Sequence, residues 1–268
     1  MDRYVVIGNP VAHSLSPEIH ARFAQATGEA ITYQRMLVEP GDFPRAAREF
    51  FAARGQGANV TLPFKLDAFA FAHERTPRAE EAGAVNTLAR RGAVILGDNT
   101  DGAGLTRDLV ANLGLALAGM RILLLGAGGA ARGVVAPLLA LSPAVLVVAN
   151  RTSERARELA RRFAPAGPVE GVGLDAMGEG YDLVVNATST STRGETIALP
   201  ERLFAPGATA YDMAYGPAAR PFLDRARAAG AHASDGLGML VEQAAESFFL
   251  WRGKRPDTAS AIAALRAR

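Results

Sequence analysis

Short runs of apolar residues alternate with longer amphipathic stretches along almost the whole chain of 268 residues. Short apolar runs bounded by Gly or Pro are typical of buried strands, and amphipathic stretches are typical of helices. In the first half, the predicted strands cover 4–7, 31–38 and 57–62 and lie around Leu88 and Ile95. Helices are predicted over 44–53 and after the HSLS segment, where Ser16 is the expected N-cap and Pro17 the first helical residue.

The second half is more regular. Its predicted strands cover 121–125, 145–149, 183–186 and 209–212, and its predicted helices cover about 130–141, 153–163 and 218–229. The tail from Leu237 to Arg266 is expected to form two helical segments separated by the turn at 253–256. This alternation predicts an α/β fold with mainly parallel sheet. The length suits two domains, and we place the boundary near 97–102, with a helix beginning after Gly102.

Composition removes several classes of function. The net charge of +2 comes from dispersed arginines rather than a basic block, so nucleic acid is not an expected partner. There is no cysteine, which excludes disulfides and thiolate metal sites, and the four histidines are scattered, so we expect no metal. The apolar runs are too short to span a bilayer and the N-terminus does not look like a signal peptide. These features favour a cytoplasmic protein that does not bind membranes.

A glycine-rich loop follows the strand at 121–125. The segment GAGGAA over 126–131 has the pattern G-x-G-x-x-A, with a strand before it and a helix after it. In this context the first glycine allows a tight turn, and the second lets the backbone approach a pyrophosphate at the helix N-terminus. The alternative is a tight strand-to-helix turn without a ligand.

The residues at the end of the next strand indicate whether the cofactor is NAD or NADP. An NAD site usually has Asp or Glu there, whereas this chain has Asn150, Arg151 and Thr152, with Arg155 one turn later. Guanidinium and hydroxyl groups suit a 2′-phosphate, so this pattern favours NADP(H). Thr152 or Ser153 could also cap the following helix, and both interpretations can hold together.

Polar side chains also gather where the strands of the first half end. Ser14 and Ser16 follow the first strand, Asn59 and Thr61 lie on the third, and Lys65 comes next; Asn86 and Asp101 lie in the later segments GAVNT and GDNTDG. Ligands bind at the carboxyl ends of strands in α/β sheets, and these groups suit a small polyhydroxylated substrate. Taken singly, each has a structural explanation as a cap, a turn residue or a solvated lysine.

The chain resembles the shikimate dehydrogenase family over nearly its whole length. The matching stretches, in the family's order, are GNPVAHSLSPEIH (8–20), GANVTLPFK (57–65), AGAVNTL (82–88), GDNTDGAGL (97–105), LLGAGGAARGV (125–134), ANRT (149–152), NATS (186–189), YDMAY (211–215) and DGLGMLVEQAAESF (235–248). One departure is visible. The family usually has a glycine about two residues after NATS, whereas here the next glycine is Gly194, so no role is carried over to 190–196.

The resemblance implies a substrate-binding domain over 1–101 plus 238–268, and a Rossmann-like NADP-binding domain over 102–237, with the C-terminal helices returning to the first. It implies an NADP-dependent oxidoreductase that reduces 3-dehydroshikimate to shikimate in chorismate and aromatic amino-acid biosynthesis. We expect a monomer or homodimer. The residues implied to bind substrate are Ser14, Ser16, Thr61, Asn86, Tyr215 and Gln243, with Lys65 and Asp101 catalytic. Those implied to bind the cofactor are Gly126, Ala127, Gly128, Gly129, Ala130, Asn150, Arg151, Thr152, Arg155, Met213 and Gly236.

Lys65 is one of only two lysines among 29 basic residues. Reduction of a ketone needs an acid that donates a proton and whose charge stabilises the developing alkoxide. Lysine can do both, whereas arginine holds its proton at any working pH. We therefore interpret Lys65 as the proton donor. A quinate/shikimate dehydrogenase and a non-catalytic NADP-binding regulatory protein remain as alternatives, and Lys65 with Asp101 argues against the second.

Overall fold

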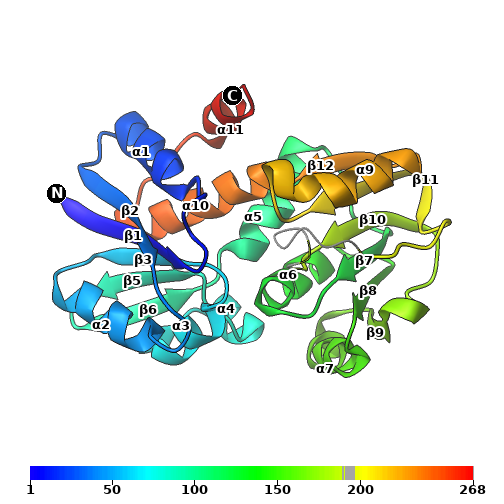
Figure 1. Ribbon diagram of the computed structural model, residues 1–268, viewed down its shortest axis with the longest axis horizontal. Coiled ribbons are helices and arrows are strands. Elements are labelled where there is room, and N and C mark those ends of the chain that lie inside the picture. Colours follow the sequence, from blue (N-terminus) through cyan, green and yellow to red (C-terminus); the bar gives the residue numbers. More distant parts are fainter. Residues whose placement is uncertain (189, 191–196, 268) are drawn as a thin grey trace. The chain divides into compact units, whose positions relative to one another are not determined.

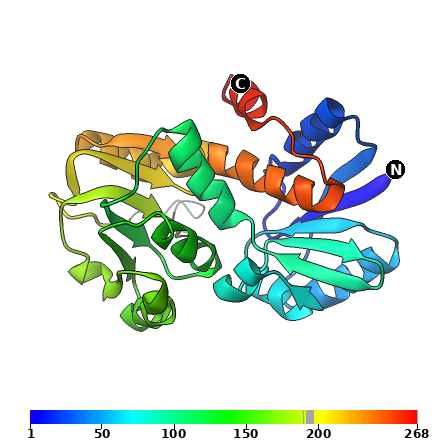
Figure 2. The same ribbon diagram turned by 180° about the vertical axis from the view of Figure 1, so that it is seen from behind.

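The computed structural model describes residues 1–188, 190 and 197–267. The chain divides into two compact units, Met1–Gly104 with Leu240–Arg268, and Leu105–Met239. The chain passes from one unit to the other within two helices, α5 (Asp101–Arg107) and α10 (Leu237–Arg252). Figure 1 and Figure 2 show the elements of each unit from two sides.

The first unit is built on a six-stranded sheet in the order β2-β1-β3-β5-β6-β4. Its strands are β1 (Asp2–Gly8), β2 (Ile31–Leu37), β3 (Gly57–Val60), β4 (Glu74–Arg75), β5 (Thr87–Arg91) and β6 (Val94–Asp98). Strand β5 is antiparallel to both β3 and β6, and the other pairs are parallel. The sheet is therefore mixed, because β5 and β6 form a hairpin instead of being joined by a crossover helix.

Side chains of successive residues in a strand point to opposite faces of the sheet. Val5 and Ile7 of β1 pack with residues of α2 (Phe43–Ala52) and α3 (Lys65–Phe71) on one face. On the other face, Tyr4 packs against Trp251 of α10 with ring centroids 4.6 Å apart and the rings tilted by 32°. The remaining helices of this unit are α1 (Ser16–Thr27), α4 (Pro77–Ala82) and α11 (Thr258–Arg266).

The second unit has a fully parallel sheet in the order β12-β11-β10-β7-β8-β9. Its strands are β7 (Arg121–Leu125), β8 (Val145–Asn150), β9 (Val169–Gly173), β10 (Tyr181–Asn186), β11 (Phe204–Asp212) and β12 (His232–Asp235). Helices α6 (Gly129–Leu139) and α7 (Ser153–Phe163) contribute to the core on one face, and α9 (Arg220–Ala228) to the core on the other. Helices on both faces of a parallel sheet define a doubly wound, Rossmann-like unit.

The structure confirms the predicted two-unit α/β fold, with the C-terminal helices packed on the first unit. Three short strands, β4, β9 and β12, were not predicted. Strand β3 ends at Val60 instead of residue 62, and a 3-10 turn at Gly216–Ala219 replaces the first residues of the predicted helix over 218–229. Among the described residues, no helix is long and apolar enough to cross a membrane.

The predicted N-cap of α1 is wrong. Leu15 occupies the cap position, where an apolar side chain cannot accept a hydrogen bond, and Ser16 is already helical. The Ser14 hydroxyl accepts from the Ser16 amide at 3.3 Å, so the serine two residues earlier satisfies one of the free amides of the first turn.

Candidate active site

Lys65 and Asp101 form a largely buried ion pair in the first unit. Lys65 begins α3 and Asp101 begins α5, and the lysine Nζ donates to Asp101 Oδ2. Their side chains are 13% and 7% exposed. A charge pair shielded from solvent interacts more strongly than one at the surface, so the two side chains hold each other in place. The structure thus brings together the two residues that were predicted to be catalytic.

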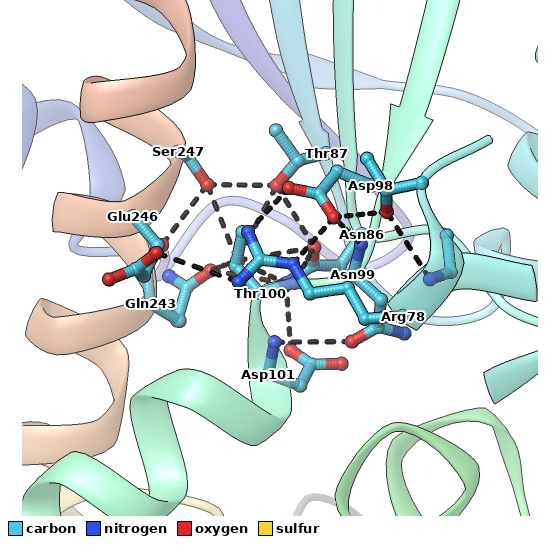
Figure 3. A network of polar contacts seen from close by, with 12 residues as sticks. Arg78, Asn86, Thr87, Asp98, Asn99, Thr100, Asp101, Gln243, Glu246 and Ser247 are labelled. Atoms are coloured by element: carbon cyan, nitrogen blue, oxygen red, sulfur yellow. Dashed lines mark hydrogen bonds and ion pairs between the residues drawn. The ribbon is translucent and has the colours of Figure 1, made fainter. Parts of the chain in front are cut away.

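The second oxygen of Asp101 is held by an amide. Asn86 lies just before β5, and its Nδ2 donates to Asp101 Oδ1 at 2.9 Å and to Thr100 Oγ1 at 2.9 Å. The Oδ1 atom of Asn86 accepts from the Thr100 backbone amide at 2.8 Å, which fixes the orientation of the side-chain amide because a backbone N–H can only donate. Gln243 of α10 accepts from Asn86 Nδ2 and Thr100 Oγ1, each at 3.3 Å. Figure 3 shows these groups converging between α10 and the hairpin β5–β6.

Ser14 and Ser16 lie together after β1. Their hydroxyls are 3.2 Å apart, and both residues are buried. The guanidinium of Arg35 on β2 donates to the Ser14 carbonyl from Nε at 3.0 Å and from Nη2 at 2.7 Å. This contact fixes the serine loop to the sheet. Thr61 follows β3, and its amide donates to Ile7 at 2.9 Å, so it lies beside the end of β1.

Asn59, which the sequence pattern groups with the substrate residues, has a structural role instead. Its Oδ1 accepts from the Tyr33 hydroxyl at 2.8 Å. Its Nδ2 donates to Ser247 Oγ at 2.9 Å and Thr87 Oγ1 at 3.1 Å. These bonds join β2, β3, β5 and α10, and they occupy both N–H groups of the amide. Thr87 and Ser247 were not recognised in the sequence, because single Thr and Ser residues carry no signal until the fold brings them together.

The glycine loop of the second unit connects β7 to α6. Gly126 has a φ of +108°, a conformation that strongly favours glycine, and a Cβ there would lie 3.2 Å from the Ala187 carbonyl oxygen. Gly128 is exposed at the N-cap of α6, and a Cβ built on it would meet no described atom within 4 Å. Ala131 is fully buried against the sheet. The loop therefore leaves open space at the N-terminus of a helix, where an anionic pyrophosphate is stabilised.

The end of β8 presents two arginines to solvent. Asn150 Nδ2 donates to the Thr152 carbonyl at 3.0 Å, which tightens the turn into α7. Arg151 and Arg155 are exposed, and in the part of the chain that the structure describes neither has an ion-pair partner. Thr152 occupies the N-cap of α7, yet no described amide donates to its side chain as a cap. The predicted capping role is therefore not observed, and the hydroxyl is available to a ligand.

The other predicted cofactor residues lie at the carboxyl edge of the same sheet. Met213 follows β11, and its amide donates to the Asn186 carbonyl at 2.9 Å. Gly236 follows β12, and a Cβ there would lie 2.4 Å from the Met213 carbonyl oxygen, so only glycine fits. Tyr215 also follows β11 and thus belongs to the second unit, whereas Ser14 and Ser16 belong to the first. The segment 191–196, to which no role was assigned, lies outside the described residues.

Taken together, these features define a class of protein. A doubly wound sheet with a glycine loop, and with arginine and hydroxyl side chains at a strand end that can bind a phosphate, is typical of an oxidoreductase that uses a nicotinamide nucleotide. A buried lysine–carboxylate pair on a separate α/β unit suits proton transfer to a carbonyl or from an alcohol.

Comparison with known proteins identifies the family. The family model described as shikimate dehydrogenase substrate binding domain matches residues 6–88, that for shikimate / quinate 5-dehydrogenase matches 108–198, and that for the shikimate 5'-dehydrogenase C-terminal domain matches 236–266. A shikimate dehydrogenase (NADP(+)) of Alkalilimnicola ehrlichii is 55% identical over 99% of this chain and 98% of its own. One of Dechloromonas aromatica is 54% identical over 100% of this chain and 98% of its own.

Solved structures agree. The shikimate 5-dehydrogenase of Thermus thermophilus in complex with NADP(H) and shikimate has a TM-score of 0.88 and 36% identity, covering 100% of this chain and 99% of that chain. An Ael1 enzyme from Pseudomonas putida has a TM-score of 0.90 and 43% identity, covering 99% and 98%. The chain therefore belongs to the shikimate dehydrogenase family.

Proposed function

We propose that the chain is an NADP-dependent shikimate dehydrogenase in which Lys65 donates the proton and Asp101 orients it. The reaction is the reversible reduction of 3-dehydroshikimate to shikimate, a step toward aromatic amino acids. Relatives more than half identical over the full chain carry the activity in their names. The buried pair formed by Lys65 and Asp101, with the second carboxylate oxygen held by Asn86, supports the roles of the residues.

The two catalytic side chains divide the proton chemistry between them. A nicotinamide supplies or accepts the hydride when it is bound. During reduction, the Lys65 ammonium donates a proton to the carbonyl oxygen. That proton becomes the proton of the new hydroxyl, and the lysine becomes neutral. During oxidation, neutral Lys65 removes the hydroxyl proton as hydride leaves the same carbon. Asp101 stabilises the lysine cation between these steps and limits the directions in which Nζ can point.

The first unit supplies the groups for a polyhydroxylated carboxylate, and we propose it as the substrate-binding domain. The hydroxyls of Ser14 and Ser16 are paired and suit the carboxylate, and Arg35 fixes the backbone carbonyl of Ser14. For the ring hydroxyls we propose Thr61, Asn86, Asp101 and Gln243. Tyr215, from the second unit, is proposed as a further contact to the carboxylate.

The second unit has the features that NADP requires, and we propose it as the cofactor domain. The loop formed by Gly126, Ala127, Gly128, Gly129 and Ala130 would hold the pyrophosphate. Asn150, Arg151, Thr152 and Arg155 would hold the 2′-phosphate, because two exposed guanidiniums and a hydroxyl at one strand end can all donate to it. Met213 and Gly236 would line the nicotinamide. We further propose that the protein acts in the cytoplasm as a monomer or homodimer.

The proposal is tested by following NADPH formation from shikimate and NADP+ with wild type, Lys65→Arg and Lys65→Met. We expect both substitutions to lower kcat by about 100-fold or more, with a much smaller change in the KM for shikimate, because the lost step is proton transfer. Lys254→Arg is the matched control. Lys254 is 52% exposed and pairs with Glu29 at 2.7 Å, a contact that arginine can also make.

Each unexpected outcome would contradict a different part of the proposal. Near-normal kcat in Lys65→Arg would exclude proton donation by Lys65 and leave it only an electrostatic role. Faster turnover of quinate with NAD+ than of shikimate with NADP+ would favour a quinate dehydrogenase. Tight NADPH binding without turnover of either substrate would indicate a non-catalytic protein.

A further inference from the structure

A second buried carboxylate lies close to the site and takes no part in the chemistry proposed above. Asp98 ends β6, three residues before Asp101, and its side chain is 1% exposed. Arg78 of α4 donates to it through both arms of the guanidinium, from Nε to Oδ1 at 2.7 Å and from Nη2 to Oδ2 at 2.5 Å. Burial raises the pKa of Asp98, but the bonds and charge of Arg78, with help from Thr76 and Asn99, outweigh it and hold the pKa below its usual value. The carboxylate is therefore charged at neutral pH.

Asp98 holds the turn that carries Asp101. Its Oδ1 also accepts from the Asn99 amide at 2.8 Å. The side chain of Asn99 accepts from the Asp101 amide at 3.2 Å and donates to the Ala84 carbonyl at 2.9 Å. The Asp98 carbonyl in turn accepts from the Asn86 amide at 3.0 Å. Asp98 thereby bonds the backbone of Asn99, whose side chain holds the Asp101 amide, and the backbone of Asn86, whose side chain holds the Asp101 carboxylate.

Arg78 extends this arrangement to α10. Its Nη1 lies 3.5 Å from Oε2 of Glu246, whose other oxygen pairs with Arg255 at 2.6 Å. Glu246 lies one turn from Gln243, which accepts from Asn86 and Thr100. Figure 3 shows Arg78 between Asp98 and Glu246, with Asp101 below them. The guanidinium therefore connects two parts of the site: the turn before α5, through Asp98, and α10, through Glu246.

We propose that Asp98, held by Arg78, is a positioning residue that sets the orientation of Asp101 toward Lys65. Its negative charge draws the guanidinium fork into a fixed place, and the fork in turn keeps the turn over 98–101 in one conformation. The inference rests on the proposed function, because it is measured as shikimate turnover. It goes further in assigning a catalytic consequence to an ion pair that touches none of the groups proposed to react.

The alternative is that the Arg78–Asp98 pair contributes only to the stability of the fold. In that case its loss would lower the melting temperature and leave turnover per folded molecule unchanged. A positioning role predicts a fall in kcat, because small displacements of a catalytic group are costly, and a fall that depends on the presence of Asp101. A double-mutant cycle separates the two explanations.

The cycle uses Asp98→Asn, Asp101→Asn and the double variant in the NADP+-coupled assay with shikimate. Asparagine has the shape of aspartate but turns an NH2 group toward the Arg78 guanidinium. One of the two hydrogen bonds from Arg78 is therefore lost. We expect Asp98→Asn to lower kcat by about 10- to 100-fold, with the KM for shikimate changed less than about threefold. In the Asp101→Asn background the same change should alter kcat by less than about twofold.

Controls address folding and charge. Arg78→Lys keeps the charge without the fork, and we expect its kcat to lie between those of wild type and Asp98→Asn. Glu80→Gln removes a different ion pair of α4, the one between Glu80 and Arg75 of β4, and should leave kcat unchanged. Circular dichroism at the assay temperature gives the folded fraction by which every kcat is corrected.

The results either support or overturn the inference. A normal corrected kcat in Asp98→Asn would overturn it, and so would equal fold-losses in the wild-type and Asp101→Asn backgrounds. If Asp98→Asn does not fold, the same cycle with Arg78→Lys decides by the same criterion. Failure of the wild type to oxidise shikimate would instead refute the proposed function, so the two failures are distinguishable.

Discussion

The imidazole of His20 is completely buried in the first unit, and this makes the stability of that unit sensitive to acid. His20 lies on α1 and is 0% exposed, and its ring stacks on Tyr33 with centroids 4.2 Å apart and an interplanar angle of 9°. Neither ring nitrogen has a hydrogen-bond partner among the described residues, although the Asn59 side chain lies near enough to act on its charge. The other rings around it are uncharged, namely Phe23, Phe248 and Trp251.

The size of the effect follows from the pKa. Burial lowers the pKa of His20 to about 3 from an ordinary value of 6.5, and Asn59 offsets only part of this shift. Because the pKa in the folded state is depressed, the unfolded chain binds the proton first, and stability falls as pH drops below 6.5 until it reaches the folded value. The two pKa values predict a loss of about 2 kcal/mol between pH 8 and pH 5 from this one side chain.

The measurement is urea unfolding followed by tryptophan fluorescence. Trp251 is the only tryptophan in the chain, and its ring centroid lies 5.3 Å from that of His20, so its signal reports the unit concerned. The free energy of unfolding should fall more steeply with pH in the wild type than in His20→Phe, and the difference isolates the contribution of His20 from that of the carboxylates. His232→Gln, at an exposed position of β12, is the control and should follow the wild type.

Equal pH dependence in the wild type and in His20→Phe would refute the reasoning. It would mean that the imidazole is protonated in the folded state with little penalty, through water or a partner that burial in the structure excludes. A loss larger than about 5 kcal/mol would also contradict it, because a shift from 6.5 to about 3 sets that upper limit.

Further predictions concern the cofactor and the polar network. Replacing Arg151 and Arg155 by Ala should raise the KM for NADP+ by about tenfold or more and leave the KM for NAD+ and shikimate unchanged, since the loss is confined to the 2′-phosphate; steady-state kinetics with both cofactors checks this. Gly236→Ala should weaken NADPH binding in a fluorescence titration, because its Cβ would lie 2.4 Å from the Met213 carbonyl oxygen. Tyr33→Phe should lower the free energy of unfolding by about 1–2 kcal/mol by leaving a buried amide oxygen unpaired, with kcat unchanged.

Much of the fold follows from local sequence. The strand–loop–helix unit at 121–139 could be predicted because a buried strand, a glycine turn and a helix each leave a short-range pattern, and Gly126 requires a conformation that few other residues adopt. The strands β9 and β12 could not be predicted in this way. Residues 169–173 contain two glycines, and β12 reads HASD, so neither has the apolar run of an inner strand. Both lie at the edges of their sheet, where less burial is needed.

The residues of the candidate site also differ in whether the sequence could predict them. Lys65 stood out because of residue usage in one chain, and Asp101 because of the family pattern. Residue type and position beside a strand do not separate Asn59 from Asn86, and only the family resemblance singled out Asn86 as a substrate residue. Only the fold shows that Asn59 is occupied by Tyr33 and Ser247, and that Asn86 faces Asp101. The partners lie up to 188 positions away in the sequence, far beyond any local pattern.

The orientation of Asn86 has a consequence for how the proposed substrate is bound. Because the Thr100 amide fixes the oxygen of its side chain, both N–H groups of Asn86 point toward protein acceptors, one of them on Asp101. A ring hydroxyl that accepts from this amide must share an N–H group that already bonds Asp101, Thr100 or Gln243. Binding of the proposed substrate at the N–H group that bonds Asp101 would couple substrate binding to the orientation of that carboxylate. Loss of Asn86 should therefore lower kcat as well as raise the KM for shikimate, whereas loss of Ser14, which contacts neither catalytic side chain in the structure, should act mainly on KM.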